Sequence, residues 1–191
     1  MISVIIPQCE EPRIHEVTEK VEKILRSRFS TVEILIASDR YRKGKGWAVR
    51  EAMKIARGAI IVFLDGDMDI DPRMILRLLP HLNEFDIVVG KKDTRGLWSR
   101  YILTLLSRIY IRMMFGIKVD TQTGIKAFWR SVMPEWETDG YGFDLEILAK
   151  AQKAKRLMYE VTVDAKVNKK MRLRSIINTF FESIKIARGL R

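Results

Sequence analysis

A strand that must be buried runs directly into a series of carboxylates, and this junction limits the folds open to the chain. Residues 59–64 are all apolar (Ala-Ile-Ile-Val-Phe-Leu), and in the run that follows every second residue is an aspartate: Asp65, Asp67, Asp69 and Asp71. A short β-branched run of this kind is typical of a strand buried on both faces of a sheet. Four neighbouring carboxylates repel one another unless a cation or a basic side chain lies among them. Because ligands of open α/β sheets bind at the carboxyl ends of the strands, we expect a ligand site here.

The chemistry of the acidic run favours a divalent metal. We predict Asp65 and Asp67 as ligands, with Asp69 as a third ligand or as support for the other two. Hard carboxylate oxygens suit Mg²⁺ or Mn²⁺, and incomplete coordination by the protein leaves room for phosphates. The alternative is a solvated acidic turn, or Asp69 as the N-cap of a helix that begins near Pro72.

The charge balance indicates an anionic partner. The 191 residues suffice for one domain with a sizeable core, and 47% apolar with 31% charged residues are the proportions of a globular protein. A net charge of +11 favours nucleic acid, a membrane surface or a phosphorylated substrate. A single cysteine, Cys9, excludes an internal disulfide and fits a reducing compartment. Neither a membrane-spanning run of about 18 apolar residues nor a signal peptide is expected from the sequence.

Strand and helix patterns alternate along the first 90 residues. Apolar runs predict strands at residues 2–6, 32–37, 59–64 and 85–90, and apolar residues at helical spacing separate them, for example over residues 12–27. This alternation predicts a mostly parallel sheet with helices on its faces. The ends of parallel strands lie at one edge, so the order brings Glu11, Asp39 and the pair Asp65 and Asp67 together.

A basic loop follows Asp39. Residues 40–46 (Arg-Tyr-Arg-Lys-Gly-Lys-Gly) lead into a helix, and such a loop can cradle a phosphate with backbone N–H groups and lysine charge. A solvated connection is the plainer interpretation of the same residues.

The second half of the chain is richer in long apolar side chains. Residues 97–115 predict a helix that is either part of the core or lies in a membrane interface. A polar turn at 120–126 leads into Ala127-Phe-Trp129, a helix is expected from 143 to about 154, and a strand from 157 to 163. The tail joins a basic stretch to a helix that docks on the domain or contacts a membrane.

Six short motifs, in order, resemble the family-2 nucleotide-sugar glycosyltransferases, and among these the polyprenyl- or dolichyl-phosphate sugar synthases. They are Val4–Pro7 with Glu11, Asp39, Gly44–Gly46, Asp65–Asp67, Asp120–Gly124 followed by Lys126–Phe128, and Gly142–Glu146. The chain departs from the family at Gln8–Glu10, where Thr-Tyr-Asn is usual, and in the short stretch between Asp39 and Gly44. In some relatives transmembrane helices follow the catalytic domain; from this sequence we expect none after the matching region.

The resemblance implies a GT-A-type fold, a Rossmann-like three-layer α/β sandwich over residues 1–174, with a basic amphipathic helix at 175–191. It also implies the roles of individual residues. Asp65 and Asp67 would hold the cation against the diphosphate, and the residues expected to bind the nucleotide sugar are Pro7, Glu11, Asp39, Lys45, Asp65 and Arg172, the last chosen from the basic residues 169–174.

The activity implied is inverting transfer of a hexose from GDP-mannose or UDP-glucose to a polyprenyl or dolichyl phosphate, at the cytoplasmic face of a membrane. The leaving diphosphate would be stabilised by the metal at Asp67 and by basic side chains. A phosphate acceptor is already ionised near neutral pH and needs no base. A sugar-hydroxyl acceptor would need one, and Asp120 or Asp144 would serve.

Other functions are compatible with parts of the pattern. A sugar-phosphate nucleotidyltransferase also uses a basic glycine loop, but directly after the first strand rather than after the second. A non-catalytic protein that binds nucleic acid or anionic membrane would explain the charge. Because the basic residues are scattered and no nucleic-acid motif is present, we expect no nucleic-acid partner.

Overall fold

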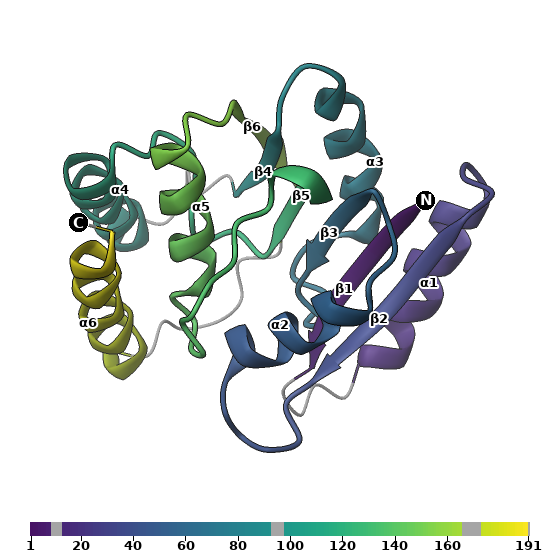
Figure 1. Ribbon diagram of the computed structural model, residues 1–191, viewed down its shortest axis with the longest axis horizontal. Helices are drawn as coiled ribbons and strands as arrows, with labels where there is room; N and C mark the ends of the chain where they lie inside the picture. Colours follow the sequence, from purple (N-terminus) through teal and green to yellow (C-terminus); the bar gives the residue numbers. More distant parts are fainter. Residues whose placement is uncertain (9–12, 93–97, 166–172, 191) are drawn as a thin grey trace.

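The computed structural model describes residues 1–8, 13–92, 98–165 and 173–190. In this part of the chain a six-stranded sheet lies between two layers of helices (Figure 1). The strands are β1 (Ile2–Gln8), β2 (Val32–Ser38), β3 (Ile60–Leu64), β4 (Ile87–Lys92), β5 (Ile125–Trp129) and β6 (Met158–Val163). The helices are α1 (Ile14–Arg26), α2 (Lys45–Ile55), α3 (Ile75–Leu78), α4 (Trp98–Phe115), α5 (Phe143–Lys153) and α6 (Leu173–Gly189).

The sheet is mostly parallel, as the strand and helix alternation predicts. Its order is β2-β1-β3-β5-β4-β6, and the pairs β1–β2, β1–β3 and β4–β6 are parallel. The strand β5 lies antiparallel between β3 and β4. The mixed, three-layer α/β architecture is therefore the one expected from the sequence.

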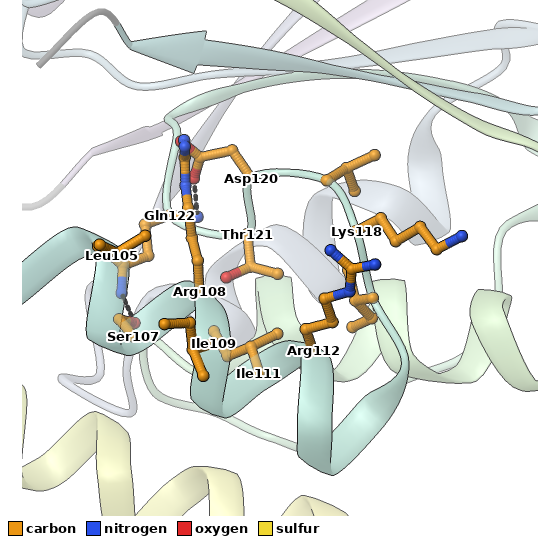
Figure 2. A pocket seen from close by; sticks show the side chains of 12 residues that line it. Leu105, Ser107, Arg108, Ile109, Ile111, Arg112, Lys118, Asp120, Thr121 and Gln122 are labelled. Carbon is orange, nitrogen blue, oxygen red and sulfur yellow. Dashed lines mark hydrogen bonds and ion pairs between the residues drawn. The ribbon is translucent and has the colours of Figure 1, made fainter.

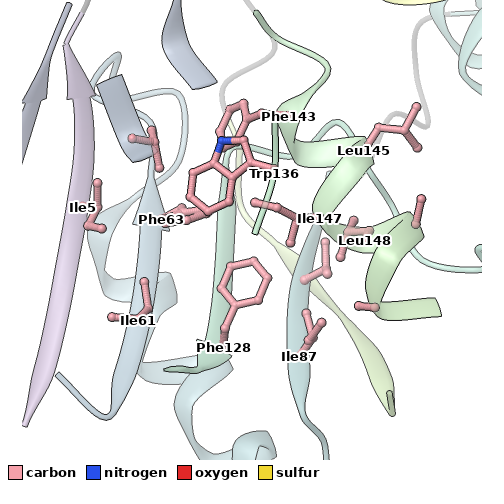
Figure 3. Packing of buried hydrophobic residues seen from close by; sticks show 14 of the residues in the cluster. Ile5, Ile61, Phe63, Ile87, Phe128, Trp136, Phe143, Leu145, Ile147 and Leu148 are labelled. Carbon is pink, nitrogen blue, oxygen red and sulfur yellow. The ribbon is translucent and has the colours of Figure 1, made fainter. Parts of the chain in front are cut away.

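Successive residues of β3 enter two different hydrophobic cores, because successive side chains of a strand point to opposite faces. Ile61 and Phe63 pack with α2 and α5, whereas Val62 and Leu64 pack with α1 and α3. Figure 3 shows the first of these cores. The ring of Phe63 lies 6.1 Å from that of Phe143 at the start of α5. Burial of each such side chain contributes about 1.5–3 kcal/mol, so packing on both faces anchors β3 beneath the acidic run.

Two local expectations differ from the structure. The sequence pattern does not predict β5, because Lys126 interrupts its apolar run; the lysine is nevertheless fully buried. The helix expected near Pro72 is a 3-10 turn, Pro72–Met74, followed by the single turn of α3. Its N-cap is Asp71, which accepts the N–H of Arg73, and not Asp69.

The tail helix α6 packs on the domain. It begins at Leu173, so the boundary expected between residues 174 and 175 falls inside it. The Ser183 hydroxyl lies 3.0 Å from the Tyr110 hydroxyl of α4, and Glu182 accepts the N–H of Gly142 at 2.6 Å. Ile186 is buried in the core beside α5. None of the helices in the described ranges is both long enough and apolar enough to cross a bilayer.

Candidate functional site

The candidate site lies at the carboxyl edge of the sheet, where β1, β2 and β3 end side by side. Because these three strands are parallel, Asp39 after β2 and Asp65 after β3 emerge at the same edge. Pro7 lies in β1 opposite Ala37 of β2, so it belongs to the same edge. The convergence of Asp39 with Asp65 is as expected. Glu11 and Arg172, with Lys169 and Lys170, lie outside the described residues.

Asp39 organises the basic loop that precedes α2. Its two carboxylate oxygens accept the backbone N–H groups of Lys43 and Gly44, both at 2.8 Å. Gly44 has a φ of 125°, a backbone conformation that residues with a Cβ rarely adopt. Asp39 therefore holds the turn that delivers Lys45 to the site.

The prediction that backbone N–H groups of this loop bind a phosphate is wrong. Besides the two N–H groups bonded to Asp39, those of Gly46 and Trp47 donate to the carbonyls of Gly140 and Asp139. Hence the loop offers an anion the side-chain charge of Lys45, and not a ring of free N–H groups.

Lys45 and Asp65 form the central ion pair of the site. The Lys45 Nζ lies 2.6 Å from Asp65 Oδ1, and the lysine side chain is only 17% exposed. Burial by itself lowers the pKa of Lys45, but the charges of Asp65 and Asp144 outweigh it and hold the pKa above its ordinary value. The ammonium also lies 5.6 Å from the centre of the Phe143 ring. Lys45 is thus a fixed positive charge beside the acidic run.

The Asp65 carboxylate occupies the space beside Gly124, where a side chain would otherwise lie. The backbone N–H of Asp65 donates to the Gly124 carbonyl at 2.8 Å. A Cβ on Gly124 would lie 2.1 Å from Asp65 Oδ2, which no side chain could tolerate. A side chain at position 124 is therefore incompatible with this placement of the carboxylate, a constraint that sequence reasoning did not reveal.

A second ion pair lies deeper in the sheet. Lys126 Nζ lies 3.0 Å from Asp144 Oδ1 and donates to the Thr123 carbonyl at 2.6 Å. Lys126 is 1% exposed, and Asp144 is in the first turn of α5. Of the two candidate bases, Asp144 is the one brought near Lys45 and Asp65. Lys126 was not predicted as a site residue, although it begins the matching motif Lys126–Phe128 and interrupts an apolar run.

The other predicted base, Asp120, is held in structural contacts. It is 8% exposed; its carboxylate accepts Arg108 Nη2 at 2.8 Å and the Gln122 N–H at 2.8 Å. Its own N–H donates to Glu160 at 3.1 Å. Figure 2 shows the contacts with Arg108 and Gln122, which are those of a capped turn.

The remaining carboxylates of the acidic run have separate roles. Asp67 Oδ1 accepts the Asp69 N–H at 3.1 Å, and Arg13 donates to the Asp67 carbonyl. Asp71 caps the 3-10 turn, and the hydrogen bond from Arg73 lowers its pKa. Among the described residues, no three histidine, cysteine, aspartate or glutamate side chains gather into a ready-made metal site. The ligand set Asp65, Asp67 and Asp69 remains a prediction.

Glu146 holds the segment that contacts the start of α2, a role that the sequence did not predict. It accepts the N–H groups of Glu137 and Thr138 and the ammonium of Lys150. Burial raises the pKa of Glu146, but these hydrogen bonds outweigh it and leave the pKa below its ordinary value of 4.5. The segment that Glu146 holds continues to Asp139 and Gly140. Their carbonyls accept the N–H groups of Trp47 and Gly46 at the start of α2.

A sequence model of glycosyl transferase family 2 matches residues 38–132, the range from the end of β2 through β5. Glycosyltransferase AglD of Haloferax volcanii is 30% identical over 139 residues, which cover 64% of this chain and 22% of that protein. The chain thus spans less than a quarter of the length of this curated relative.

Solved structures of similar fold include glucosyl-3-phosphoglycerate synthase from Mycobacterium tuberculosis. Its complex with Mn²⁺, UDP and phosphoglyceric acid has a TM-score of 0.77 and 18% identity, and the match covers 97% of this chain and 76% of that one. Its complex with Mn²⁺, UDP-glucose and phosphoglyceric acid has a TM-score of 0.75 and 17% identity, with 99% and 79% covered. At this identity the likeness establishes the fold alone, and that fold is GT-A.

Proposed function

The chain belongs to glycosyl transferase family 2, and on that basis we propose that it transfers a hexose from a nucleoside-diphosphate sugar, with inversion, to a lipid phosphate. The observation that carries this proposal is the Lys45–Asp65 pair at the carboxyl edge of the sheet, two residues before Asp67 in the sequence. A buried ammonium paired with a carboxylate of the acidic run offers both a direct contact for a diphosphate and a ligand for a cation that neutralises it.

The residues present fit a divalent cation. Asp65 and Asp67 supply hard oxygen donors, and Gly124 leaves the space that the Asp65 carboxylate occupies. These two residues would hold Mg²⁺ or Mn²⁺, with Asp69 as the third candidate. When bound, the cation supplies positive charge against the leaving diphosphate. The similar synthase was crystallised with Mn²⁺ and UDP, which supports this assignment.

The rest of the site would bind and orient the donor. Pro7 and Asp39 lie at the edge where a base and ribose would rest, and Lys45 would contact the diphosphate. UDP-glucose is the donor favoured by the complexes of the similar synthase, and GDP-mannose is the second candidate. Glu11 and Arg172 remain candidates for the same ligand.

The acceptor proposed is a polyprenyl or dolichyl phosphate at the cytoplasmic surface of a membrane. A phosphate monoester is largely ionised near neutral pH, so it attacks without a base. This suits a site where Asp120 is held by Arg108 and Asp144 by Lys126. Phosphoglyceric acid, which is bound in the similar synthase, is a second candidate that also carries a phosphate group.

Attachment to the membrane would be peripheral. Apolar side chains on one side of α4 and on α6 are exposed although their helices pack on the domain: Leu106, Met113, Phe180 and Phe181 are each 47–83% exposed. Helices of this kind, rich in basic residues, bind in the headgroup region of bilayers.

The experiment is calorimetric titration of UDP and GDP, each with Mn²⁺ and with chelator. We expect metal-dependent binding of one nucleotide, weakened at least about tenfold by Lys45→Met because a charge-assisted contact is lost. The matched control is Lys43→Met, since Lys43 is exposed and its backbone N–H would still bond to Asp39. Transfer from the bound donor to a polyprenyl phosphate is then measured. Absence of binding by either nucleotide would refute the donor site.

A further inference from the structure

A cavity lies between α4 and residues 117–122. Its volume is about 230 Å³. Figure 2 shows that Arg108 and Arg112 both extend from α4 toward this segment, and that Thr121 lies between them. Lys118 lines the cavity on the side of Arg112.

The cavity carries an uncompensated positive charge. Asp120 is the only acidic residue among those that line it, and it is paired with Arg108. Arg112 and Lys118 are exposed and make no ion pair within the described part of the chain. Two positive charges therefore remain for an anion from outside.

A buried hydrogen-bond donor at the cavity lacks a partner. The Arg108 Nε is buried and has no acceptor among the described residues. Thr121, which also lines the cavity, is 6% exposed and carries a hydroxyl. Buried donors without acceptors are rare in proteins, and this one favours a ligand with acceptor oxygen atoms.

The size of the cavity restricts that group. A volume of 230 Å³ holds about seven or eight waters and is below the usual range of about 300–1,000 Å³ for small-molecule pockets. It suits a phosphate with its immediate ester carbons, and it is too small for a long chain or a nucleotide.

The rim of the cavity is apolar and continues onto an exposed surface. Leu105 and Ile109 line the cavity and are 44% and 47% exposed. Met113, one turn further along α4, is 83% exposed. The Tyr110 ring of α4 lies 5.4 Å from that of Phe180, which extends the apolar surface onto α6.

From this arrangement we propose that the cavity binds the headgroup phosphate of an anionic membrane lipid, with Arg112, Lys118 and Thr121 as the contacts. Basic pockets next to apolar surface are the usual sites for anionic headgroups. The apolar rim would meet the acyl boundary and leave the lipid chains outside the cavity. The inference rests on the membrane attachment in the proposed function and assigns it a specific site.

The test compares two variants that lose the same charge. Arg112→Gln/Lys118→Gln removes the two cations of the cavity that are not paired with Asp120. Lys23→Gln/Arg28→Gln removes two exposed cations from α1 and the turn that follows it, far from α4 in Figure 1. Binding to phosphatidylglycerol–phosphatidylcholine vesicles is measured by co-sedimentation. We expect the cavity variant to partition about thirty-fold more weakly than wild type, and the control variant to change much less. An equal fall in both would overturn the proposal in favour of general charge attraction.

Two soluble probes separate a lipid from a free phosphate ester. Dihexanoyl phosphatidylglycerol, used as a monomer, should bind wild type and lose binding in the cavity variant. Glycerophosphoglycerol, which has the same phosphate diester and no acyl chains, should bind much more weakly. Equal binding of both probes would assign the cavity to free phosphate esters and overturn the lipid assignment.

Titration of UDP with Mn²⁺ on the same variants keeps this proposal distinct from the donor site. If UDP binds all three proteins alike while vesicle binding does not depend on the cavity, the lipid site alone is wrong. If vesicle binding depends on the cavity and UDP does not bind, the lipid site stands and the donor site is wrong.

Discussion

The Lys126 ammonium lies 3.0 Å from the Asp144 carboxylate inside the central sheet, where the lysine is 1% exposed. This contact joins β5 to the first turn of α5. The charge of Asp144 also acts on Lys45, which is itself paired with Asp65. Basic and acidic groups thus alternate from the interior of the sheet to the predicted donor site. The arrangement positions Lys45 and Asp65 without leaving a buried charge unpaired.

Opening the inner pair should be costly. We expect Lys126→Met to lower the free energy of unfolding by about 3 kcal/mol, because a charge on Asp144 is left without its partner in a poorly solvated place. Urea denaturation measures the loss. The matched control is Lys20→Met, which breaks an exposed pair with Glu16 and should cost less than about 1 kcal/mol. Equal costs for the two variants would contradict a special role for Lys126.

Gly124 should tolerate no side chain. A Cβ there would lie 2.4 Å from Asp65 Cγ, so Gly124→Ala must displace the carboxylate and break its contact with Lys45. We expect at least about a tenfold loss of Mn²⁺-dependent nucleotide affinity and a cost of about 1–3 kcal/mol in stability. Gly189→Ala is the control, since no atom lies within 4 Å of its added Cβ. Unchanged nucleotide affinity in Gly124→Ala would show that the placement of Asp65 is unimportant.

Much of this fold could be predicted from periodicity. The strands β1, β2, β3, β4 and β6 lie close to the predicted ranges, because apolar runs bounded by polar residues are strong local signals. The convergence of Asp39 with Asp65 follows from parallel strands alone. The strand β5 could not be predicted, because it contains the buried Lys126. Burial of this lysine depends on an ion pair with Asp144, which lies 18 residues away in sequence.

The sequence predicted which residues form the site better than it predicted the contacts between them. Lys45 and Asp65 were both expected to face the donor, but their direct contact depends on the turn held by Asp39. The prediction of a backbone phosphate site was wrong because the carbonyls of Gly140 and Asp139, which are distant in sequence, accept the N–H groups of Gly46 and Trp47. Tertiary partners of this kind leave no local pattern.

Acid should weaken the support beneath the site. Because the folded-state pKa of Glu146 is lowered, the unfolded chain binds more protons just below pH 4.5, and stability falls as the pH falls through that range. We expect Glu146→Gln to flatten this acid limb and to cost about 2 kcal/mol near neutral pH. The measurement is the free energy of unfolding from pH 7 to about pH 3. An acid limb as steep as that of wild type would exclude Glu146 as a major contributor.

The acidic run should divide into one residue that binds metal and one that serves the fold. Asp67→Asn and Asp71→Asn each remove one negative charge from the same segment. Asp71 is the N-cap of the turn at Pro72, a role that asparagine fills equally well, and its pair with Arg73 is exposed. We therefore expect Asp71→Asn to retain Mn²⁺ affinity within about twofold in the presence of UDP, and Asp67→Asn to lose at least about tenfold. Calorimetric titration of Mn²⁺ measures both. If the two variants lost affinity equally, the cation would be held by the general charge of the run, and the assignment of Asp67 as a ligand would be wrong.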